Sequence, residues 1–237
     1  MANSIIHALK NIDAFLMRKV QRYIPGTIWN TLCRKIDKKM ESILDVGCGD
    51  GVAIQMLFEK RNNQFNYTGI DIYQASLDMA MEKAKQLKLN SDFLLCDVRQ
   101  LAVDMKSYDV VVCLEVLEHL NKKDGELLIQ KLEEIARKQV ILTLPVGVFE
   151  QEPVDDKDNP FMLHKSAWYP SEFISRGYSV RGYGLPIVGG SLGFLARLPV
   201  PLPFIRRFIW ILATSWTYFM PRFAGWMICI KKVNLDS

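Results

Sequence analysis

Hydrophobic residues gather in short, near-continuous runs that alternate with longer stretches in which they recur every three or four positions. The runs predict strands at residues 42–46, 67–72, 92–95, 108–114 and 140–144. The stretches between them predict helices at about 74–87 and 125–137. Strands that are apolar throughout are buried on both faces, and alternation with helices is typical of a parallel sheet covered on both sides. We therefore expect a doubly wound α/β fold.

Inside the predicted helix 74–87, the spacing places one set of side chains against the sheet. This set consists of Leu77, Ala80, Met81 and Ala84.

The pattern changes after residue 144. A short helix beginning at Ser171, a strand near 178–183 and a last strand at 226–232 bracket an apolar segment. Before the first strand, residues 4–24 and about 27–40 predict two helices separated by Pro25-Gly26. We expect one domain, made of N-terminal helices (1–40), a core (41–183), an apolar basic insertion (184–224) and a last strand with a tail (225–237).

Three alternating glycines follow the first predicted strand. The strand ends at Asp45, and Gly47, Gly49 and Gly51 come before helical spacing resumes at Val52. Glycines let a backbone approach a ligand closely, and the N-terminus of the following helix favours such contacts. A dinucleotide fingerprint needs a glycine where Val52 stands, and no Gly-Lys-Ser/Thr follows, so a P-loop is excluded. The stretch predicts a cofactor loop of another kind.

Each of the next three strands also leads into a carboxylate. Asp71 comes 20 residues after Gly51, the spacing of an acid that holds ribose hydroxyls, and Asp97 and Glu115 follow the third and fourth strands. Open α/β sheets bind ligands at the carboxyl ends of their parallel strands. We therefore expect these side chains to surround one site.

In this order and spacing, four segments resemble the class I S-adenosylmethionine-dependent methyltransferases: 45–51, Asp71, 96–98 and 114–119. The resemblance covers about residues 41–183 and the final strand. It implies a Rossmann-like, mostly parallel seven-stranded sheet, an enzyme that transfers methyl groups, and S-adenosyl-L-methionine as its cofactor. A rim of acids also suits a positively charged sulfonium better than a pyrophosphate.

The resemblance also implies roles for single residues. Asp45 and the glycine loop should line the methionine half of the cofactor, Asp71 should hold the ribose, and Asp97 should accept from the adenine amino group. The residues so assigned are Asp45, Gly47, Cys48, Gly49, Gly51, Asp71, Ile72, Asp97, Val98, Leu114 and Glu115.

Three side chains are candidates for removing a proton from the methyl acceptor: Glu118, His119 and His164. His119 lies one turn after the fourth strand, where helix capping or packing against the cofactor is an equal alternative. His164 lies in the segment His-Lys-Ser-Ala-Trp-Tyr-Pro, and similar small-molecule methyltransferases have a histidine there, bordering the acceptor pocket. No Cys-x-x-Cys or Cys/His cluster occurs, so no metal is expected.

Nucleic acid is not an expected partner. An Asn/Asp-Pro-Pro-Tyr/Phe motif after the fourth strand and a Pro-Cys pair are both missing, which argues against the amine and cytosine-C5 methylases that share this fold. We expect a small-molecule or lipid-like acceptor instead. The sequence does not indicate an oligomeric state.

The two ends of the chain are basic, although its net charge is only +4. Residues 1–40 carry eight Lys/Arg against two acids, and residues 173–237 carry eight against one. The insertion 184–224 has no charged groups except four arginines, and its uncharged part 208–221 is shorter than the ~20 residues of a membrane span. It favours a helix lying in a membrane interface; a lid over the acceptor pocket or a dimer contact is the alternative.

The hypothesis from sequence is a methyltransferase that acts on a small or amphipathic acceptor, such as a lipid, a quinone or a lipid-linked sugar, by O- or C-methylation. We expect it in the cytoplasm, peripheral to the cytoplasmic membrane face through 184–224 and the N-terminal helices. Five scattered cysteines agree with a reducing compartment. An aminopropyl transferase on the same fold and a non-catalytic S-adenosylmethionine-binding scaffold remain the alternatives.

Overall fold

The computed structural model describes residues 31, 34–36, 39–54, 57, 65–148, 159–184 and 215–233. The predicted helix 4–24, most of the predicted helix 27–40 and residues 185–214 of the insertion lie outside this part of the chain.

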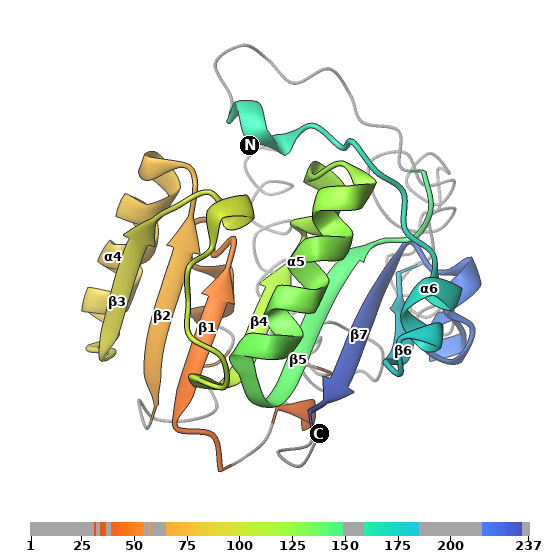
Figure 1. Ribbon diagram of the computed structural model, residues 1–237, viewed down its shortest axis with the longest axis horizontal. Coiled ribbons are helices and arrows are strands. Elements are labelled where there is room, and N and C mark those ends of the chain that lie inside the picture. The colour runs from red at the N-terminus through yellow and green to blue at the C-terminus, as the bar shows by residue number, and fades with distance from the viewer. Residues whose placement is uncertain are drawn as a thin grey trace, which may run out of the picture.

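A seven-stranded sheet forms the centre of the described structure (Figure 1), in the order β3-β2-β1-β4-β5-β7-β6. The strands are β1 (Ser42–Val46), β2 (Asn66–Asp71), β3 (Ser91–Leu95), β4 (Tyr108–Leu114), β5 (Ala136–Pro145), β6 (Ser179–Tyr183) and β7 (Trp226–Lys232). Neighbouring strands from β3 to β5 pair in parallel, whereas β7 is antiparallel to both β5 and β6. The predicted mostly parallel, Rossmann-like sheet is confirmed.

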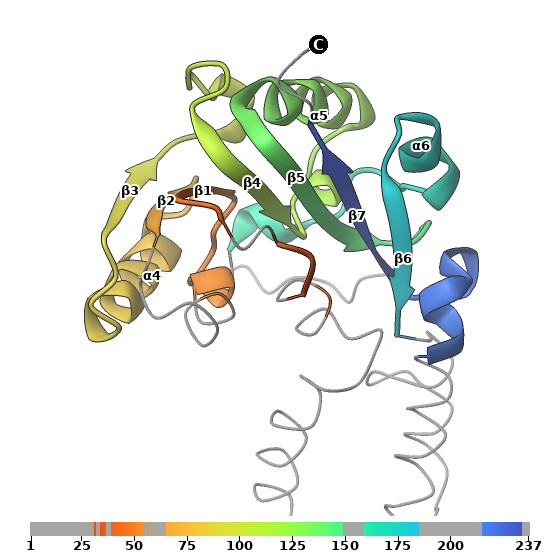
Figure 2. The ribbon, with the colours of Figure 1, turned by 90° about the horizontal axis from the view of Figure 1, so that it is seen from below.

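Helices cover both faces of the sheet. Figure 2 shows α4 (Gln74–Gln86) on one face, and α5 (Lys122–Ile135) and α6 (Pro170–Ser175) on the other. Short 3-10 turns complete the described elements: η1 (Val98–Gln100), η2 (Leu117–His119), η3 (Pro160–Met162) and η4 (Pro221–Phe223).

Two hydrophobic clusters explain why the strands are apolar at nearly every position. Leu44 and Val46 of β1 pack in the cluster that contains the buried side of α5, whereas Ile43 packs in the cluster that contains Ala80 of α4. Successive strand residues point to opposite faces, so a strand with a helix on each side needs apolar residues throughout.

Two details of the predicted helices are wrong. Met81 was expected on the buried side of α4, but it is 49% exposed, while Leu77, Ala80 and Ala84 are buried. Helix α5 begins three residues earlier than expected, at Lys122, because the Asn121 side chain accepts a hydrogen bond from the Asp124 backbone N–H at 2.9 Å and caps the helix.

Candidate functional site

A cavity of about 500 Å³ lies at the carboxyl ends of the parallel strands. This volume falls in the range of small-molecule sites. Of the residues assigned to the cofactor from sequence, all but Gly51 line it: Asp45, Gly47, Cys48, Gly49, Asp71, Ile72, Asp97, Val98, Leu114 and Glu115. The η3 region adds Phe161, Met162 and Lys165, which sequence reasoning did not assign to the site.

The glycine loop keeps its shape because side chains do not fit at two of its positions. Gly47 has a φ of 75°, and a Cβ there would lie 2.2 Å from Val116 Cγ2. Gly51 has a φ of 82°, and its Cβ would lie 3.2 Å from the Ala80 Cα of α4. Gly51 therefore lets the loop pack on α4 and does not line the cavity, in contrast to its predicted role.

Asp71 connects the glycine loop to the end of β2. Its Oδ2 accepts a hydrogen bond from the Gly49 backbone N–H at 2.8 Å, and its Oδ1 accepts one from the Tyr73 backbone N–H at 2.9 Å. Each carboxylate oxygen has a second lone pair, so the group can hold the loop and still accept from ribose hydroxyls. That second role stays a prediction.

Asp45 is a buried carboxyl with one unsatisfied oxygen at the cavity wall. Its Oδ2 accepts a hydrogen bond from the Tyr67 hydroxyl at 2.5 Å, and its Oδ1 has no hydrogen-bond partner among the described residues. Burial raises the pKa of Asp45 to about 7, with the Tyr67 hydrogen bond lowering it and the negative charge of Asp71 raising it. A bound ammonium group would satisfy this oxygen, and the methionine half of the cofactor carries one.

Asp97 is already paired with a neighbour. Its Oδ1 accepts from the Arg99 backbone N–H at 2.9 Å and from Arg99 Nε at 3.0 Å. Hydrogen bonds from the Arg99 side chain are the main cause that lowers the pKa of Asp97. Sequence reasoning did not anticipate this pairing, although the Asp-x-Arg spacing at the start of η1 is a signal for it. Asp97 lines the cavity beside Arg99, and its role toward adenine stays a prediction.

Glu115 directly follows β4 and has a strained backbone conformation. Its φ of 56° is in the left-handed region, which non-glycine residues rarely adopt. Its backbone N–H donates to the Thr143 carbonyl at 2.8 Å, and the Tyr183 hydroxyl of β6 donates to its Oε1 at 3.1 Å. Burial raises the pKa of Glu115. The turn that follows brings Val116 against Gly47 and leads directly into η2.

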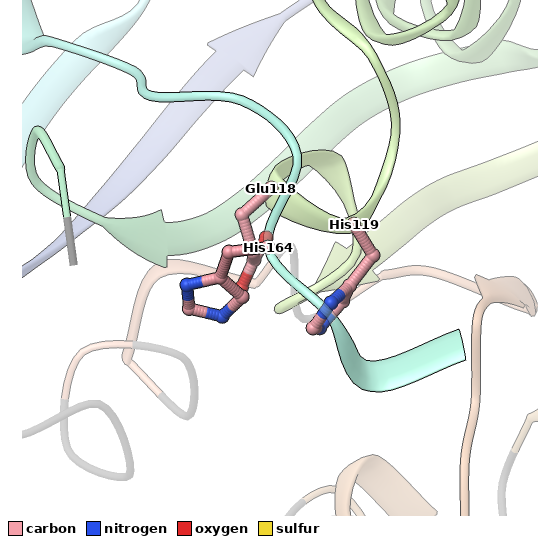
Figure 3. A group of neighbouring side chains, drawn as sticks. All are labelled: Glu118, His119 and His164. Carbon is pink, nitrogen blue, oxygen red and sulfur yellow. The ribbon is translucent and has the colours of Figure 1, made fainter. Parts of the chain in front are cut away.

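The three acceptor-side candidates lie together in space (Figure 3). Glu118 and His119 come from η2, and His164 comes from the segment after η3. The backbone N–H groups of Lys165 and Ser166 donate to the Glu118 carbonyl at 2.7 and 3.1 Å, which holds the two segments side by side. The ring centroids of His119 and His164 are 4.9 Å apart. Of the three, His119 lines the cavity.

The protonation of this cluster differs from that of exposed groups. Burial, followed by the negative charge of Glu115, raises the pKa of Glu118, which is 2% exposed. Burial also lowers the pKa of His119, and a hydrogen bond with the Leu163 carbonyl opposes this shift. At neutral pH the pair is therefore biased toward uncharged side chains.

Part of this chain matches a known protein family. Residues 43–139 match the family described as "Methyltransferase domain". Residues 43–139 therefore carry a methyltransferase domain, in agreement with the enzyme class and the S-adenosylmethionine cofactor that were predicted from the sequence.

Similar proteins carry related names. A ubiquinone biosynthesis O-methyltransferase from Coxiella burnetii is 32% identical over 87 residues, which are 37% of this chain and 36% of that protein. A ubiquinone biosynthesis O-methyltransferase from Rickettsia bellii is 41% identical over 78 residues, which are 33% of this chain and 31% of that protein. The match thus spans about a third of the length of these curated relatives. A crystal structure of the Synechocystis magnesium protoporphyrin IX methyltransferase with bound S-adenosylhomocysteine is 16% identical, with a TM-score of 0.51 over 90% of this chain and 83% of that one, and is similar in fold.

Proposed function

We propose that this protein transfers the methyl group of S-adenosylmethionine to a hydroxyl oxygen of a small, amphipathic acceptor. The observation that carries the proposal is the position of the Glu118, His119 and His164 cluster, one edge of which forms part of the cavity wall. Transfer to a hydroxyl requires loss of its proton, whereas an ionised carboxylate acceptor has no proton to lose. The relatives named O-methyltransferases support the same choice.

The residues of the cavity suit the different parts of the cofactor. The unsatisfied Asp45 Oδ1 would accept from the cofactor's ammonium group, and Asp71 would accept from the ribose hydroxyls. A Cβ added at Gly49 would meet no atom within 4 Å, so the loop presents open backbone on this side. Ile72 and Val98 would pack beside the adenine, and Glu115 would lie near the sulfonium.

The chemistry divides between cofactor and protein. S-adenosylmethionine supplies a methyl carbon on a sulfonium: when the acceptor oxygen attacks, the O–C bond forms, the C–S bond breaks and a neutral thioether remains. The protein aligns the two reactants and excludes water, which together lower the barrier by roughly 7–11 kcal/mol in favourable cases. The cluster of η2 and His164 assists the loss of the acceptor proton.

Apolar side chains on the η3 side suit an acceptor with a hydrophobic body. Phe161 and Met162 line the cavity, and they are 39% and 47% exposed. Leu163 follows them with 54% exposure. A quinone or isoprenoid precursor has both a hydroxyl and an apolar part, and would use both kinds of surface.

We propose that a second apolar surface binds the cytoplasmic face of the membrane. It consists of Trp216, Phe219, Met220 and Phe223, which are 49%, 72%, 45% and 43% exposed. Arg222 lies beside it, with its guanidinium 4.5 Å from the Phe223 ring centroid, and can bind anionic headgroups. Within the described ranges, no helix has the length and hydropathy to cross a bilayer.

This surface is attached to the carboxyl end of β6. A Cβ at Gly182 of β6 would lie 2.3 Å from the Thr217 carbonyl oxygen, so the two backbones are in close contact. Because β7 is antiparallel to both β5 and β6, the carboxyl end of β6 lies at the same edge of the sheet as the cavity. An acceptor dissolved in the bilayer would reach the site without entering water.

Radiolabelled methyl transfer tests the activity. The purified protein is incubated with methyl-labelled S-adenosylmethionine and a bacterial lipid extract, and the labelled product is identified. Label in an ether or methoxy group is the expected result. A labelled methyl group bound to carbon would contradict O-methylation and show C-methylation. Cofactor binding without any transferred label would favour the non-catalytic scaffold.

Sedimentation with anionic liposomes tests the membrane surface. We expect Phe219→Ser to reduce binding by about tenfold, because it removes one large apolar side chain from the interface. Met105→Ser is the matched control, since Met105 is 64% exposed but lies in the loop before β4. Equal binding of the wild type and Phe219→Ser would contradict the membrane proposal.

A further inference from the structure

The acceptor-side cluster has the composition of a metal site. Glu118, His119 and His164 each offer one ligand atom, and these three atoms lie within 4.8 Å of one another. A tetrahedral zinc ion, with bonds of about 2.0–2.1 Å, brings its ligand atoms to about 3.4 Å. Small side-chain rotations would therefore be sufficient to bind one ion.

The buried Glu118 carboxyl has an oxygen atom that could bind a metal ion, whereas the oxygens of buried carboxyls are usually taken up by hydrogen bonds. The residue is 2% exposed, and its Oε2 has no hydrogen-bond partner in the part of the chain that the structure describes. A buried polar atom without a partner is unfavourable by about 1–3 kcal/mol. A cation between the carboxyl and the two rings would satisfy this atom.

The contact between His119 and Leu163 orients the histidine for this role. His119 Nδ1 lies 3.3 Å from the Leu163 carbonyl oxygen. A carbonyl can only accept, so this hydrogen bond requires the tautomer with the proton on Nδ1, which leaves the Nε2 lone pair for a metal ion. Metal-binding histidines commonly donate their second ring N–H to a carbonyl or carboxylate, which fixes the tautomer.

The position of His164 is also secured by the fold. The backbone N–H of the next residue, Lys165, donates to the Glu118 carbonyl at 2.7 Å. The Ser166 hydroxyl and Trp168 Nε1 both donate to the Leu117 carbonyl, at 3.1 and 3.3 Å. Two segments that are distant in sequence thus present their ligands from a common hydrogen-bonded base, as a preorganised site requires.

We propose that Glu118, His119 and His164 bind one divalent transition-metal ion of the zinc class, and that this ion binds the acceptor hydroxyl. Two imidazoles with one carboxylate favour such an ion over magnesium or calcium, which prefer oxygen ligands. Three protein ligands leave a coordination position open, as in catalytic zinc sites. Because His119 lines the cavity, we expect the open coordination position to face the bound acceptor.

The ion would change how the acceptor loses its proton, and this part rests on the proposed function. A hydroxyl bound to a divalent cation has a lower pKa, so its proton leaves to solvent before attack. The oxygen then displaces the thioether from the methyl carbon, and the ion keeps its charge. All three side chains act as ligands in this scheme, and no electron is transferred. This proposal departs from the sequence-based expectation of no metal, because the two histidines come together only in the fold.

Cobalt titration tests the site without any acceptor. The full chain is treated with a chelator, dialysed and titrated with Co²⁺, and the visible absorption of the bound ion is recorded. We expect one Co²⁺ per chain, displaced by Zn²⁺, and at least tenfold weaker binding for both Glu118→Gln and His164→Ala. His7→Ala is the matched control, because His7 is the third histidine of the chain, and it should bind as the wild type does.

A melting shift with S-adenosylhomocysteine, measured on the same samples, shows that each variant is folded. Absence of saturable Co²⁺ binding by the wild type, or unchanged binding by both variants, would overturn the metal site while leaving the proposed function in place. Binding of Co²⁺ without methyl transfer to any hydroxyl would leave the metal site and remove the proposed function.

Discussion

The Tyr67 hydroxyl donates a hydrogen bond to Asp45 Oδ2 across 2.5 Å, and both side chains are buried beside the cofactor cavity. Tyr67 lies on β2 and Asp45 on β1, so the bond joins two neighbouring parallel strands directly below the glycine loop. It supports a carboxyl whose second oxygen has no partner among the described residues.

This carboxyl should make stability depend on pH. The pKa of Asp45 is about 7 in the fold and 3.8 in the unfolded reference. Because the folded value is the higher one, its contribution is fully present below about pH 4 and is lost as pH rises to about 7. Between these limits the free energy of unfolding should fall by up to about 4 kcal/mol through this group.

Denaturant unfolding of the cofactor-free protein at pH 4.5 to 8 measures this effect. Asp45→Asn cannot ionise, and its unfolding free energy should lose that part of the pH dependence. In Tyr67→Phe the fall in unfolding free energy should occur at higher pH, because the Tyr67 hydrogen bond lowers the pKa of Asp45. The same pH profile in the wild type and Asp45→Asn would show that the carboxyl does not titrate in this range.

Gly47→Ala should disrupt the glycine loop. The new Cβ would lie 2.2 Å from Val116 Cγ2, at a backbone φ of 75°. Overpacking and the left-handed backbone together should lower the free energy of unfolding by about 2–4 kcal/mol. Thermal or denaturant unfolding gives the value.

Val116→Ala provides the complementary test of this contact. In the double variant the space left by Val116 should accept the new methyl group, so the two effects should be non-additive by about 1 kcal/mol or more. Gly49→Ala is the control for backbone conformation alone, since Gly49 also has a positive φ but no atom within 4 Å of the new Cβ. Additive effects of the Gly47 and Val116 changes would contradict the described contact.

Trp168→Phe should impair the acceptor side and spare the cofactor. Trp168 is 1% exposed, and its Nε1 donates to the Leu117 carbonyl at 3.3 Å and to the Ser166 hydroxyl at 2.9 Å. Phenylalanine retains most of the packing but removes the N–H donor, which should lower the free energy of unfolding by about 1 kcal/mol. The segment that carries His164 should then shift relative to η2.

We expect kcat to fall by about tenfold, because small displacements of positioned groups are costly in rate. The dissociation constant of S-adenosylhomocysteine should stay within about twofold, since Trp168 does not line the cavity. Equal losses in kcat and in cofactor affinity would indicate a general structural effect instead of a positioning role.

Local patterns predicted the parts of the fold that depend on local chemistry. Strands β1, β4 and β7 begin and end where their apolar runs do, at 42–46, 108–114 and 226–232. The start of α5 was missed because it is set by the Asn121 cap and not by an apolar residue. Met81 was misplaced because the sheet covers a narrower side of α4 than the helical spacing alone suggests.

Within the site, too, local sequence patterns predicted single positions but not the contacts between distant residues. The cavity residues at strand ends, such as Gly47 and Asp71, were predictable from their positions and from the family resemblance, whereas Phe161, Met162 and Lys165 were not. The pairing of Tyr67 with Asp45, of Tyr183 with Glu115, and of His119 with His164 was not, because each joins residues that are distant in sequence. Such contacts leave no periodicity in a single sequence.

The most direct test of the account is the binding of S-adenosylhomocysteine by calorimetry, in the wild type, Asp71→Ala and Asp78→Ala. Asp71 holds the glycine loop through Gly49 and faces the cavity, whereas Asp78 lies on α4 and accepts from Gln74 at 2.7 Å. We predict one site per chain for the wild type and for Asp78→Ala, and at least a hundredfold loss of affinity for Asp71→Ala. No binding to the wild type, or equal binding by all three proteins, would contradict the account.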